Sequence, residues 1–425
     1  LLPGLLAGIM RVGSELGPGS SPYLAAVTVA LCTLSLLPVA VALLWGFRVG
    51  GTATALTAGT LAAVWFELVY FAPKALNEAV ACHLLLPSLY LAGFHDGKRG
   101  RLVLSGLLLG TSLALRIQLA PAALCALALV CRTDIRGKWL PLAGSAAALF
   151  TLCGLLDMLT WSYPFQSVWY GFAVNILQGK SLLWGTHPAY HYPITAARVW
   201  SWAILPLAAL LLAGARDGRL LLLTAATIWA PHSLIAHKEY RFVYPALPML
   251  LIVAGCGLGL LYRRFERIST SRWPSRAALV AILLACCLTS LSLAPRFDAS
   301  RTGVELMTRG SSHWHYFRAP LRIFRALGRE KDACGLGLRH VHWALTGGYT
   351  YLHRNIPLYD IDSERKLQDL SQGFNYLLAS GITTPRIGAY ARVGCLDEYC
   401  LYRRPGTCTP LSDYHLNRVL IKRGE

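Results

Sequence analysis

The sequence predicts a mainly α-helical, polytopic membrane protein with a small α/β domain at its C-terminal end. Hydrophobic residues make up 55% of the 425-residue chain and charged residues only 14%, a composition typical of membrane proteins rather than soluble globular domains. Apolar runs of spanning length follow one another as far as Pro295, after which short apolar runs alternate with turn residues. We therefore expect a transmembrane domain over residues 1–295 and an α/β domain over residues 296–425.

The apolar runs predict about ten membrane passes or part-passes. One run, 102–131, is too long for a single helix and carries Arg116 and Gln118 in its middle. We predict that it forms two short helices, 102–118 and 119–131, which meet at a polar elbow. The other predicted helices are 24–47, 52–71, 76–94, 139–158, 199–215, 220–236, 242–262 and 277–295.

Basic residues predict which side of the membrane each loop faces. Of the 21 Lys and Arg residues before Pro295, 14 fall in alternate loops, and loops rich in Lys and Arg stay cytoplasmic. These loops lie around residues 48, 98–101, 132–138, 216–219 and 263–276. The other loops and the C-terminal domain are then expected in the lumen or periplasm. The net charge of +19 fits anionic lipid headgroups and this orientation, and we expect no nucleic-acid partner.

The acidic residues of the first domain divide between the two predicted faces. Four sit among the cytoplasmic basic residues, where charge balance explains them: Asp96, Asp134, Asp217 and Glu266. Five fall at or near the opposite face: Glu15, Glu67, Glu78, Asp157 and Glu239. That face also carries Arg116, Gln118, His187, His237, Lys238 and Arg241. The pattern predicts a polar concavity that opens to the non-cytoplasmic side.

Residues 237–242 form the densest part of this set. They read His-Lys-Glu-Tyr-Arg-Phe and place four ionisable side chains between two apolar runs. Charge this close to hydrocarbon is costly, so such clusters are functional candidates. The alternative is a polar loop that only joins two helices, but such loops are usually richer in Gly, Ser, Asn or Asp.

The long loop 159–198 is dense in aromatic residues and has few charges. Such a segment is expected to lie in the headgroup layer as interfacial helices. A plain aromatic belt would explain its Trp and Tyr residues, but it would not explain the Gly185-Thr-His187-Pro188 stretch, because a belt needs no histidine.

These residue types suit an enzyme that uses a sugar linked to a lipid phosphate. Cations stabilise the departing phosphate, whose charge grows as the glycosidic bond breaks. Arg241 and Lys238 suit this role, and His237 and Arg116 are further candidates, because a guanidinium offers a planar fork and an ammonium a point charge. A carboxylate within reach of the acceptor hydroxyl serves as general base.

Residues 237–242 resemble the signature of the dolichyl-phosphate-mannose-dependent mannosyltransferases of glycosyltransferase family 22, which build GPI anchors and the lipid-linked N-glycan precursor. The resemblance extends to the Arg116-Ile-Gln118 elbow, to Asp157 and the loop after it, and to C-terminal stretches 343–349 and 352–357. It implies a GT-C fold and inverting transfer of mannose from dolichyl- or polyprenyl-phosphate mannose to a lipid-linked glycan or GPI-type acceptor, with no nucleotide-sugar site. The expected substrate-binding residues are Arg116, Gln118, Asp157, His187, His237, Lys238, Glu239 and Arg241.

Two departures from the family pattern bear on activity. Tyr240 stands where many members carry a second Glu. The family's principal catalytic acid lies in a first luminal loop, and the opening Leu1-Leu-Pro3-Gly4 is similar to the end of that loop. We therefore expect the catalytic base upstream of Leu1, name none within the chain, and expect residues 1–425 alone to be inactive in mannose transfer.

The C-terminal part is expected to form a small α/β domain. The predicted strands are 341–344, 356–359, 386–389 and 400–402, and the predicted helices are 321–327 and 364–370. Cys334, Cys395, Cys400 and Cys408 allow one or two disulfides in an oxidising compartment, with the pairing open. Its histidines lack metal-ligand spacing, so we expect no metal and no other cofactor.

Two other functions remain open at this point. A lipid or glycolipid transporter or flippase would explain many passes with buried charge, although transporters usually show repeats and broken helices. An inactive subunit of a glycosylation complex would fit the missing loop. The expected location is the endoplasmic reticulum membrane of a eukaryote or the inner membrane of a bacterium. The acceptor, linkage, organism class and oligomeric state stay undetermined by these patterns.

Overall fold

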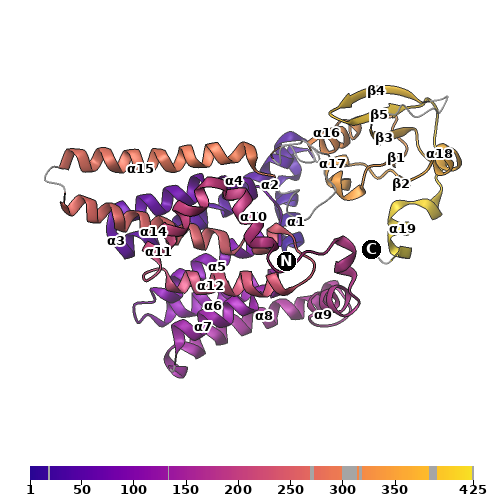
Figure 1. Cartoon of the computed structure of the whole chain (residues 1–425). Coiled ribbons are helices and arrows are strands. Elements are labelled where there is room, and N and C mark those ends of the chain that lie inside the picture. Colours follow the sequence, from indigo (N-terminus) through magenta and orange to yellow (C-terminus); the bar gives the residue numbers. More distant parts are fainter. Residues whose placement is uncertain are drawn as a thin grey trace. The chain divides into compact units, whose positions relative to one another are not determined.

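The computed structural model describes residues 1–17, 20–132, 134–268, 272–298, 314, 318–381 and 390–423. The chain divides into two compact units. The first contains Leu1–Arg11 and Ala26–His313, and the second contains Val12–Ala25 and Trp314–Glu425. The described part of the first unit is helical, whereas the second holds a β-sheet (Figure 1), so the predicted fold class is confirmed.

Helices wholly or mostly in the first unit follow one another with short connections. They are α1 (Leu2–Val12), α2 (Ser21–Leu34), α3 (Leu36–Val64), α4 (Phe66–Phe71), α5 (Asn77–Gly93), α6 (Arg99–Leu115), α7 (Ala120–Cys131), α8 (Leu140–Thr160), α9 (Gln166–Phe172), α10 (His191–Trp200), α11 (Ile204–Gly214), α12 (Arg219–Leu234), α13 (Tyr240–Val243), α14 (Ala246–Ile268) and α15 (Arg272–Leu293).

Within the described residues, five helical stretches are long and apolar enough to cross a membrane. They are Ser21–Val64, Ile135–Thr160, His191–Gly214, Ala246–Ile268 and Ser275–Arg296. The other predicted passes are helices of 12 to 17 residues, namely α5, α6, α7 and α12. The protein is thus a multi-pass membrane protein that combines helices of spanning length with shorter ones.

Two predicted helix breaks are confirmed. The helices expected over 24–47 and 52–71 are separated within α3 by non-helical Gly50 and Gly51, and Gly51 has a φ of +71°, which glycine adopts without strain. The run 102–131 forms α6 and α7, joined at Arg116 and a 3₁₀ turn, Ile117–Leu119. Both breaks come where the sequence supplies residues that do not favour an uninterrupted helix.

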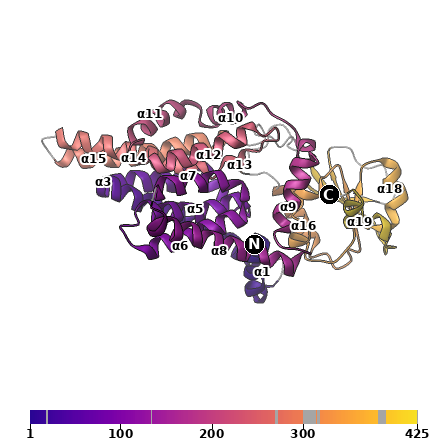
Figure 2. The ribbon, with the colours of Figure 1, turned by 90° about the horizontal axis from the view of Figure 1, so that it is seen from below.

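Helix α14 packs closely against both α3 and α11, and Figures 1 and 2 show it running alongside α3. A Cβ added at Gly255 would lie 2.4 Å from the Ala58 Cα on α3, and one at Gly257 would lie 2.1 Å from the Leu210 carbonyl oxygen on α11. Small residues permit such backbone approaches between membrane helices, where van der Waals packing supplies much of the stability.

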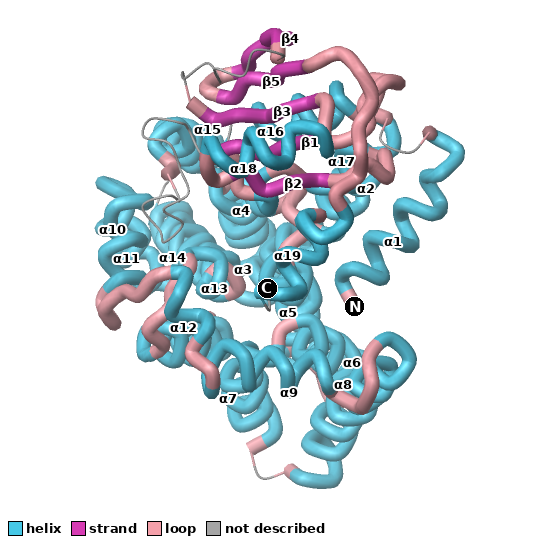
Figure 3. Tube along the Cα trace, turned by 90° about the vertical axis from the view of Figure 1, so that its right-hand side faces the viewer, coloured by secondary structure: helices cyan, strands magenta, loops and turns pink. Residues whose placement is uncertain are grey.

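The second unit is built around a mixed sheet whose five described strands have the order β2-β1-β3-β5-β4 (Figure 3). The strands are β1 (Leu336–Arg339), β2 (Leu358–Ile361), β3 (Tyr376–Ser380), β4 (Ala391–Leu396) and β5 (Tyr399–Arg403). The helices are α16 (Arg318–Leu327), α17 (Gly348–Leu352), α18 (Glu364–Leu370) and α19 (Leu416–Arg423). Strand β1 pairs in parallel with β2 and β3, and β5 pairs antiparallel with β3 and β4.

Side chains that alternate along the strands bury both faces of this sheet. Leu378 faces a core that includes Phe324 of α16, whereas its neighbour Leu377 faces a core that includes Leu367 of α18. Disulfides join Cys334 to Cys408 and Cys395 to Cys400. The second bond links opposed residues of the β4–β5 hairpin, so the structure resolves the pairing that the sequence left open.

The helices of the second unit are better predicted than its strands. The helix predicted over 364–370 and the strand over 400–402 are confirmed, and the helix predicted over 321–327 lies within α16. The strand predicted over 341–344 is wrong, because β1 ends at Arg339, His340 adopts a positive φ of 52°, and Trp343–Leu345 form a 3₁₀ turn.

The strand predicted over 356–359 begins two residues later, at Leu358, immediately after Pro357, which cannot donate to a β-ladder. The strand predicted over 386–389 lies outside the described residues.

Candidate functional site

The His237–Phe242 stretch lies between two helices, where the backbone leaves the helical path. Helix α12 ends at Leu234, and both Ile235 and Glu239 are extended. The short helix α13 then begins at Tyr240. An extended residue followed by a helical turn directs neighbouring side chains to different sides, so Tyr240 is buried while Glu239 and Arg241 are only partly buried.

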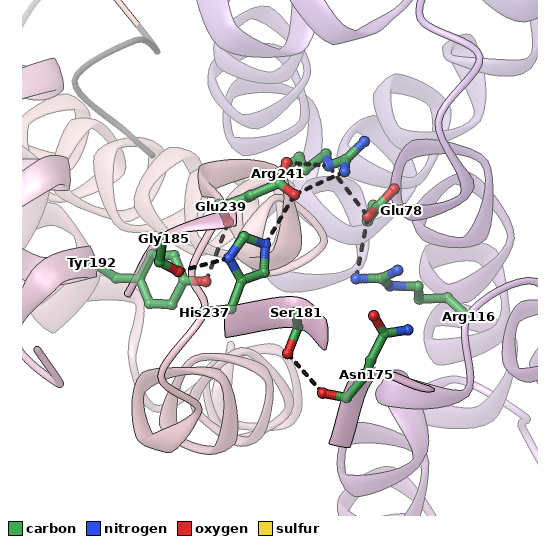
Figure 4. A network of polar contacts seen from close by, with 9 residues as sticks. All are labelled: Glu78, Arg116, Asn175, Ser181, Gly185, Tyr192, His237, Glu239 and Arg241. Atoms are coloured by element: carbon green, nitrogen blue, oxygen red, sulfur yellow. Dashed lines mark hydrogen bonds and ion pairs between the residues drawn. The ribbon is translucent and has the colours of Figure 1, made fainter. Parts of the chain in front are cut away.

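Glu239 is the first centre of an ion network (Figure 4). Arg241 donates from Nη2 to Glu239 Oε1 at 3.0 Å, and its Nε lies 2.8 Å from Glu239 Oε2. On the same carboxylate, Oε1 lies 3.2 Å from His237 Nε2. Tyr192 of α10 donates to the Glu239 backbone carbonyl at 3.2 Å. The carboxylate therefore orients one guanidinium and one imidazole together.

Glu78, at the start of α5, is the second centre of the network. Its Oε1 lies 3.2 Å from Arg116 Nη2 and 3.8 Å from Arg241 Nε. The Glu78 side chain is only 5% exposed, against 18% for Arg116 and 39% for Arg241. The Arg116 guanidinium also stacks over the Phe242 ring at 4.8 Å. A buried carboxylate thus places two guanidinium groups side by side, and Arg241 is the more accessible of them.

Lys238 has a different setting from its neighbours. Its side chain is buried, and Nζ donates to the carbonyl oxygens of His187, at 3.0 Å, and of Ile235. Burial lowers the pKa of its ammonium group. The His187 backbone N–H donates to Ala236 at 2.9 Å, so Lys238 fastens the 185–187 loop to the 235–238 segment instead of facing an open space.

The structure brings four of the predicted site residues together through side-chain contacts: Arg116, His237, Glu239 and Arg241. Two others meet beside them, because the Lys238 ammonium group donates to the His187 backbone carbonyl. His237 Nδ1 also lies 3.0 Å from the Gly185 carbonyl. Asp157 stands apart from this network in the described contacts, because it accepts from the Ser167 backbone N–H at 2.9 Å and from Ser167 Oγ at 2.7 Å. It joins the end of α8 to the start of α9. Gln118 is exposed and takes no part in the contacts described for the network.

The loop 159–198 also approaches the network near Arg116 (Figure 4). It contains α9, a π-helical turn over Ala173–Leu177 and a 3₁₀ turn over Lys180–Trp184. Ser181 Oγ donates to the Asn175 backbone carbonyl at 2.7 Å, and Figure 4 shows the Asn175 side chain directed toward the Arg116 guanidinium. Much of this loop exposes aromatic rings, including Trp161, Trp169 and Tyr170, as expected of a segment in the headgroup layer.

Sequence reasoning missed Glu78 as a member of the site. It grouped Glu78 with the acidic residues of the non-cytoplasmic face, but nothing in its local sequence identified Arg116 and Arg241 as partners. Within the described ranges, no group of three or more His, Cys, Asp or Glu side chains is arranged to hold a metal ion. The chemistry of the site is that of guanidinium groups oriented by carboxylates, a combination suited to anions such as phosphate.

Residues 107–308 match the Alg9-like mannosyltransferase family. This match covers just under half of the chain. The matched range contains Arg116, the loop 159–198 and the His237–Phe242 stretch, so it includes most of the ion network. The family resemblance expected from the sequence is confirmed.

Three curated relatives show similar segments. A GPI alpha-1,2-mannosyltransferase 3 of Danio rerio is 29% identical over 154 residues, which are 36% of this chain and 26% of the relative. A GPI mannosyltransferase 3 of Schizosaccharomyces pombe is 36% identical over 84 residues, 20% of this chain and 16% of the relative. One of Candida albicans is 32% identical over 114 residues, 27% of this chain and 20% of the relative. The matches thus span about a quarter or less of the relatives' lengths.

Solved structures confirm the GT-C type of fold. The crystal structure of ArnT from Cupriavidus metallidurans in the apo state has a TM-score of 0.58 at 14% identity and covers 93% of this chain and 86% of that one. The structure of ArnT bound to undecaprenyl phosphate has a TM-score of 0.57 at 16% identity, over 95% and 88%. At this identity the likeness concerns the fold alone.

Proposed function

We propose that this protein is an inverting mannosyltransferase that moves mannose from a dolichyl- or polyprenyl-phosphate donor to a lipid-linked glycan or GPI-type acceptor. We place the reaction at the non-cytoplasmic face, in the endoplasmic reticulum membrane if the source is eukaryotic. The match to the Alg9-like mannosyltransferase family and the names of the GPI mannosyltransferase relatives support this reaction class.

The observation that carries the proposal is the pair of guanidinium groups that Glu78 holds together. The donor bears a phosphate diester, and cleavage of its glycosidic bond leaves a phosphate with greater negative charge. Guanidinium groups placed beforehand stabilise that charge more in the transition state than in the ground state, which is the condition for faster chemistry. Arg241 would contact the phosphate directly, and Arg116, held over Phe242, would add charge beside it.

The other residues support these two arginines. Glu239 and His237 orient Arg241, and Lys238 with His187 holds the loop that borders the network. The acid that removes the acceptor proton is not assigned within this chain.

Binding of the product lipid tests the proposal without requiring turnover. Purified protein in nanodiscs is titrated with dolichyl phosphate, and a neutral dolichol serves as the lipid control. Loss of a charge-assisted contact is expected to make Arg241→Met bind dolichyl phosphate about tenfold or more weakly. Arg241→Lys is expected to recover part of the affinity, because it restores the charge but not the fork.

Arg101→Met provides the matched control. Arg101 also pairs with a carboxylate, and its side chain is 34% exposed against 39% for Arg241. It lies in α6, outside the ion network. Equal loss of binding in both variants, or equal affinity of the wild type for dolichyl phosphate and dolichol, would overturn the phosphate assignment. Transfer from dolichyl-phosphate mannose then distinguishes an enzyme from a protein that only binds or moves the lipid.

A further inference from the structure

A second buried carboxylate lies next to the ion network but belongs to a different set of contacts. Glu67, in the first turn of α4, is fully buried. Its Oε2 accepts from the indole N–H groups of Trp65, at 2.7 Å, and Trp200, at 2.8 Å. Its Oε1 accepts from the hydroxyl of Tyr240. Three donors from three parts of the chain therefore meet at one side chain.

The contacts of Glu67 are unusual for a buried acid. Among the described residues, no Lys, Arg or His forms an ion pair with it, and its partners are two indoles and a phenol. A buried carboxylate is costly unless its oxygens are hydrogen-bonded, and the three donors supply those bonds. Burial and the neighbouring Glu67 hold the pKa of the Tyr240 hydroxyl well above its ordinary value, so this hydroxyl keeps its proton and donates.

The position of Tyr240 makes this contact matter for the site. Tyr240 lies between Glu239 and Arg241 in the sequence, and these two residues form the salt bridge of the network. Its ring is buried, 5% exposed, and its hydroxyl is anchored on α4. Helix α10 is hydrogen-bonded both to Glu67 and to the backbone next to Tyr240, because Trp200 donates to the Glu67 carboxylate and Tyr192 donates to the Glu239 carbonyl.

We propose that Glu67 is a positioning residue, which holds Tyr240 and α10 so that Glu239 and Arg241 keep the geometry needed to bind a lipid phosphate. The functional half of this inference, that Glu67 supports binding of a lipid phosphate, rests on the proposed function. The structural half, that Glu67 holds Tyr240 and α10 in place, does not. Glu67 touches neither the phosphate nor the sugar in this arrangement. It acts only through the backbone of residues 239–241.

Amide hydrogen exchange measures the structural half directly. The variants are Glu67→Gln, Tyr240→Phe and the double variant, each in nanodiscs. A hydrogen bond to a charged group corresponds to about a tenfold to hundredfold change in a local opening equilibrium, so peptides covering residues 236–244 are expected to exchange faster by about that factor in each single variant. The double variant is expected to exchange no faster than the faster single variant, because both changes remove one contact.

Thr57→Val is the matched control, since Thr57 Oγ1 donates to the Gly255 carbonyl at 2.8 Å in a buried bond between α3 and α14. This variant should leave exchange in residues 236–244 unchanged. Equal exchange of that segment in Glu67→Gln and wild type would overturn the inference, and so would a loss of protection spread evenly over α3, α6 and α14.

The functional half is read from dolichyl phosphate affinity in the same samples. Both single variants are expected to bind about tenfold more weakly, with non-additive loss in the double variant and no change in Thr57→Val. Faster exchange in 236–244 with unchanged affinity would overturn the positioning role while leaving Arg241 as the phosphate ligand. If wild type binds no dolichyl phosphate, the proposed function fails, and the exchange data still decide whether Glu67 holds the segment.

Discussion

Two carboxylates of the first unit, Asp96 and Glu78, each contact two guanidinium groups. Comparing them distinguishes charge balance at the protein surface from a buried arrangement that can serve as a binding site. Asp96, in the loop between α5 and α6, has Oδ2 2.5 Å from both Arg48 Nη2 and Arg101 Nη1. Its side chain is 41% exposed. Glu78, at the opposite end of α5, has longer contacts to its two arginines but is only 5% exposed.

The shorter distances at Asp96 suggest that its ion pairs contribute more to stability than those of Glu78, but the greater exposure of Asp96 to water leads to the opposite conclusion. An ion pair in contact with water gains little, because water already solvates both charges. A buried carboxylate has lost its hydration and depends on its partners. Asp96 is therefore explained by the basic residues of a loop predicted to face the cytoplasm. Burial of the Glu78 carboxylate has a cost in stability, and its role in positioning Arg116 and Arg241 explains why an acid lies there.

The largest expected effect is the contrast between Glu78→Gln and Asp96→Asn. Glu78→Gln leaves two guanidinium groups without their shared buried counter-charge, so we expect a loss of about 3–5 kcal/mol in the free energy of unfolding. Asp96→Asn should cost much less, because water solvates its ion pairs with Arg48 and Arg101. Unfolding in mixed detergent micelles, followed by near-UV circular dichroism, measures both. Similar losses in the two variants would contradict the distinction.

The same contrast shows what the sequence could predict. Composition and apolar run length were enough for the helical class, because burial in lipid leaves few other options for the backbone. Arg116 and Gln118 marked the break between α6 and α7, since polar residues in mid-run are locally visible. The sorting of acids by face also separated Asp96 from Glu78, because the basic loops carry that information.

The partners of each acid were beyond the sequence. Glu78 meets Arg116 and Arg241, which lie far apart along the chain, and no local pattern states which helices touch. Lys238 was assigned to phosphate from its charge and from its place in the family signature, whereas its ammonium group binds backbone carbonyls. The β1 strand was missed because its four residues are too few to show alternation, and 341–344 was chosen in its place.

A smaller effect extends the comparison to Lys238, a buried cation to which the described part of the chain supplies no carboxylate partner. Burial lowers the pKa of Lys238 below its ordinary value of 10.5. At a pH below the folded-state pKa, the ammonium is charged in both states and the folded state bears the full cost of burying it. As the pH rises from the folded pKa to 10.5, the folded state loses the proton first, so the free energy of unfolding increases.

Lys238→Met should therefore flatten the increase in stability with pH in the window just below pH 10.5. Lys74, whose pKa is also lowered by burial, stays in both proteins and leaves a residual increase. Lys98→Met, which removes an exposed lysine of the α5–α6 loop, is the control and should leave the wild-type slope intact. The measurement is detergent unfolding at several pH values. If the free energy of unfolding of Lys238→Met rises with pH as steeply as that of wild type, burial of this ammonium group does not affect stability.

The smallest expected effect is the response of the two carboxylate clusters to salt. Ions screen charges that are in contact with water over about 10 Å at 0.1 M and about 3 Å at 1 M, but they enter a buried site poorly. The stability difference between Asp96→Asn and wild type, already small at low salt, should fall toward zero as NaCl is raised to 1 M. The difference between Glu78→Gln and wild type should persist, because the Glu78 carboxylate is shielded by protein from the added ions. A parallel decline of both differences would mean that water and salt reach Glu78 as freely as Asp96. The network would then be a solvated surface cluster, and its guanidinium groups would bind phosphate no better than those of Arg48 and Arg101.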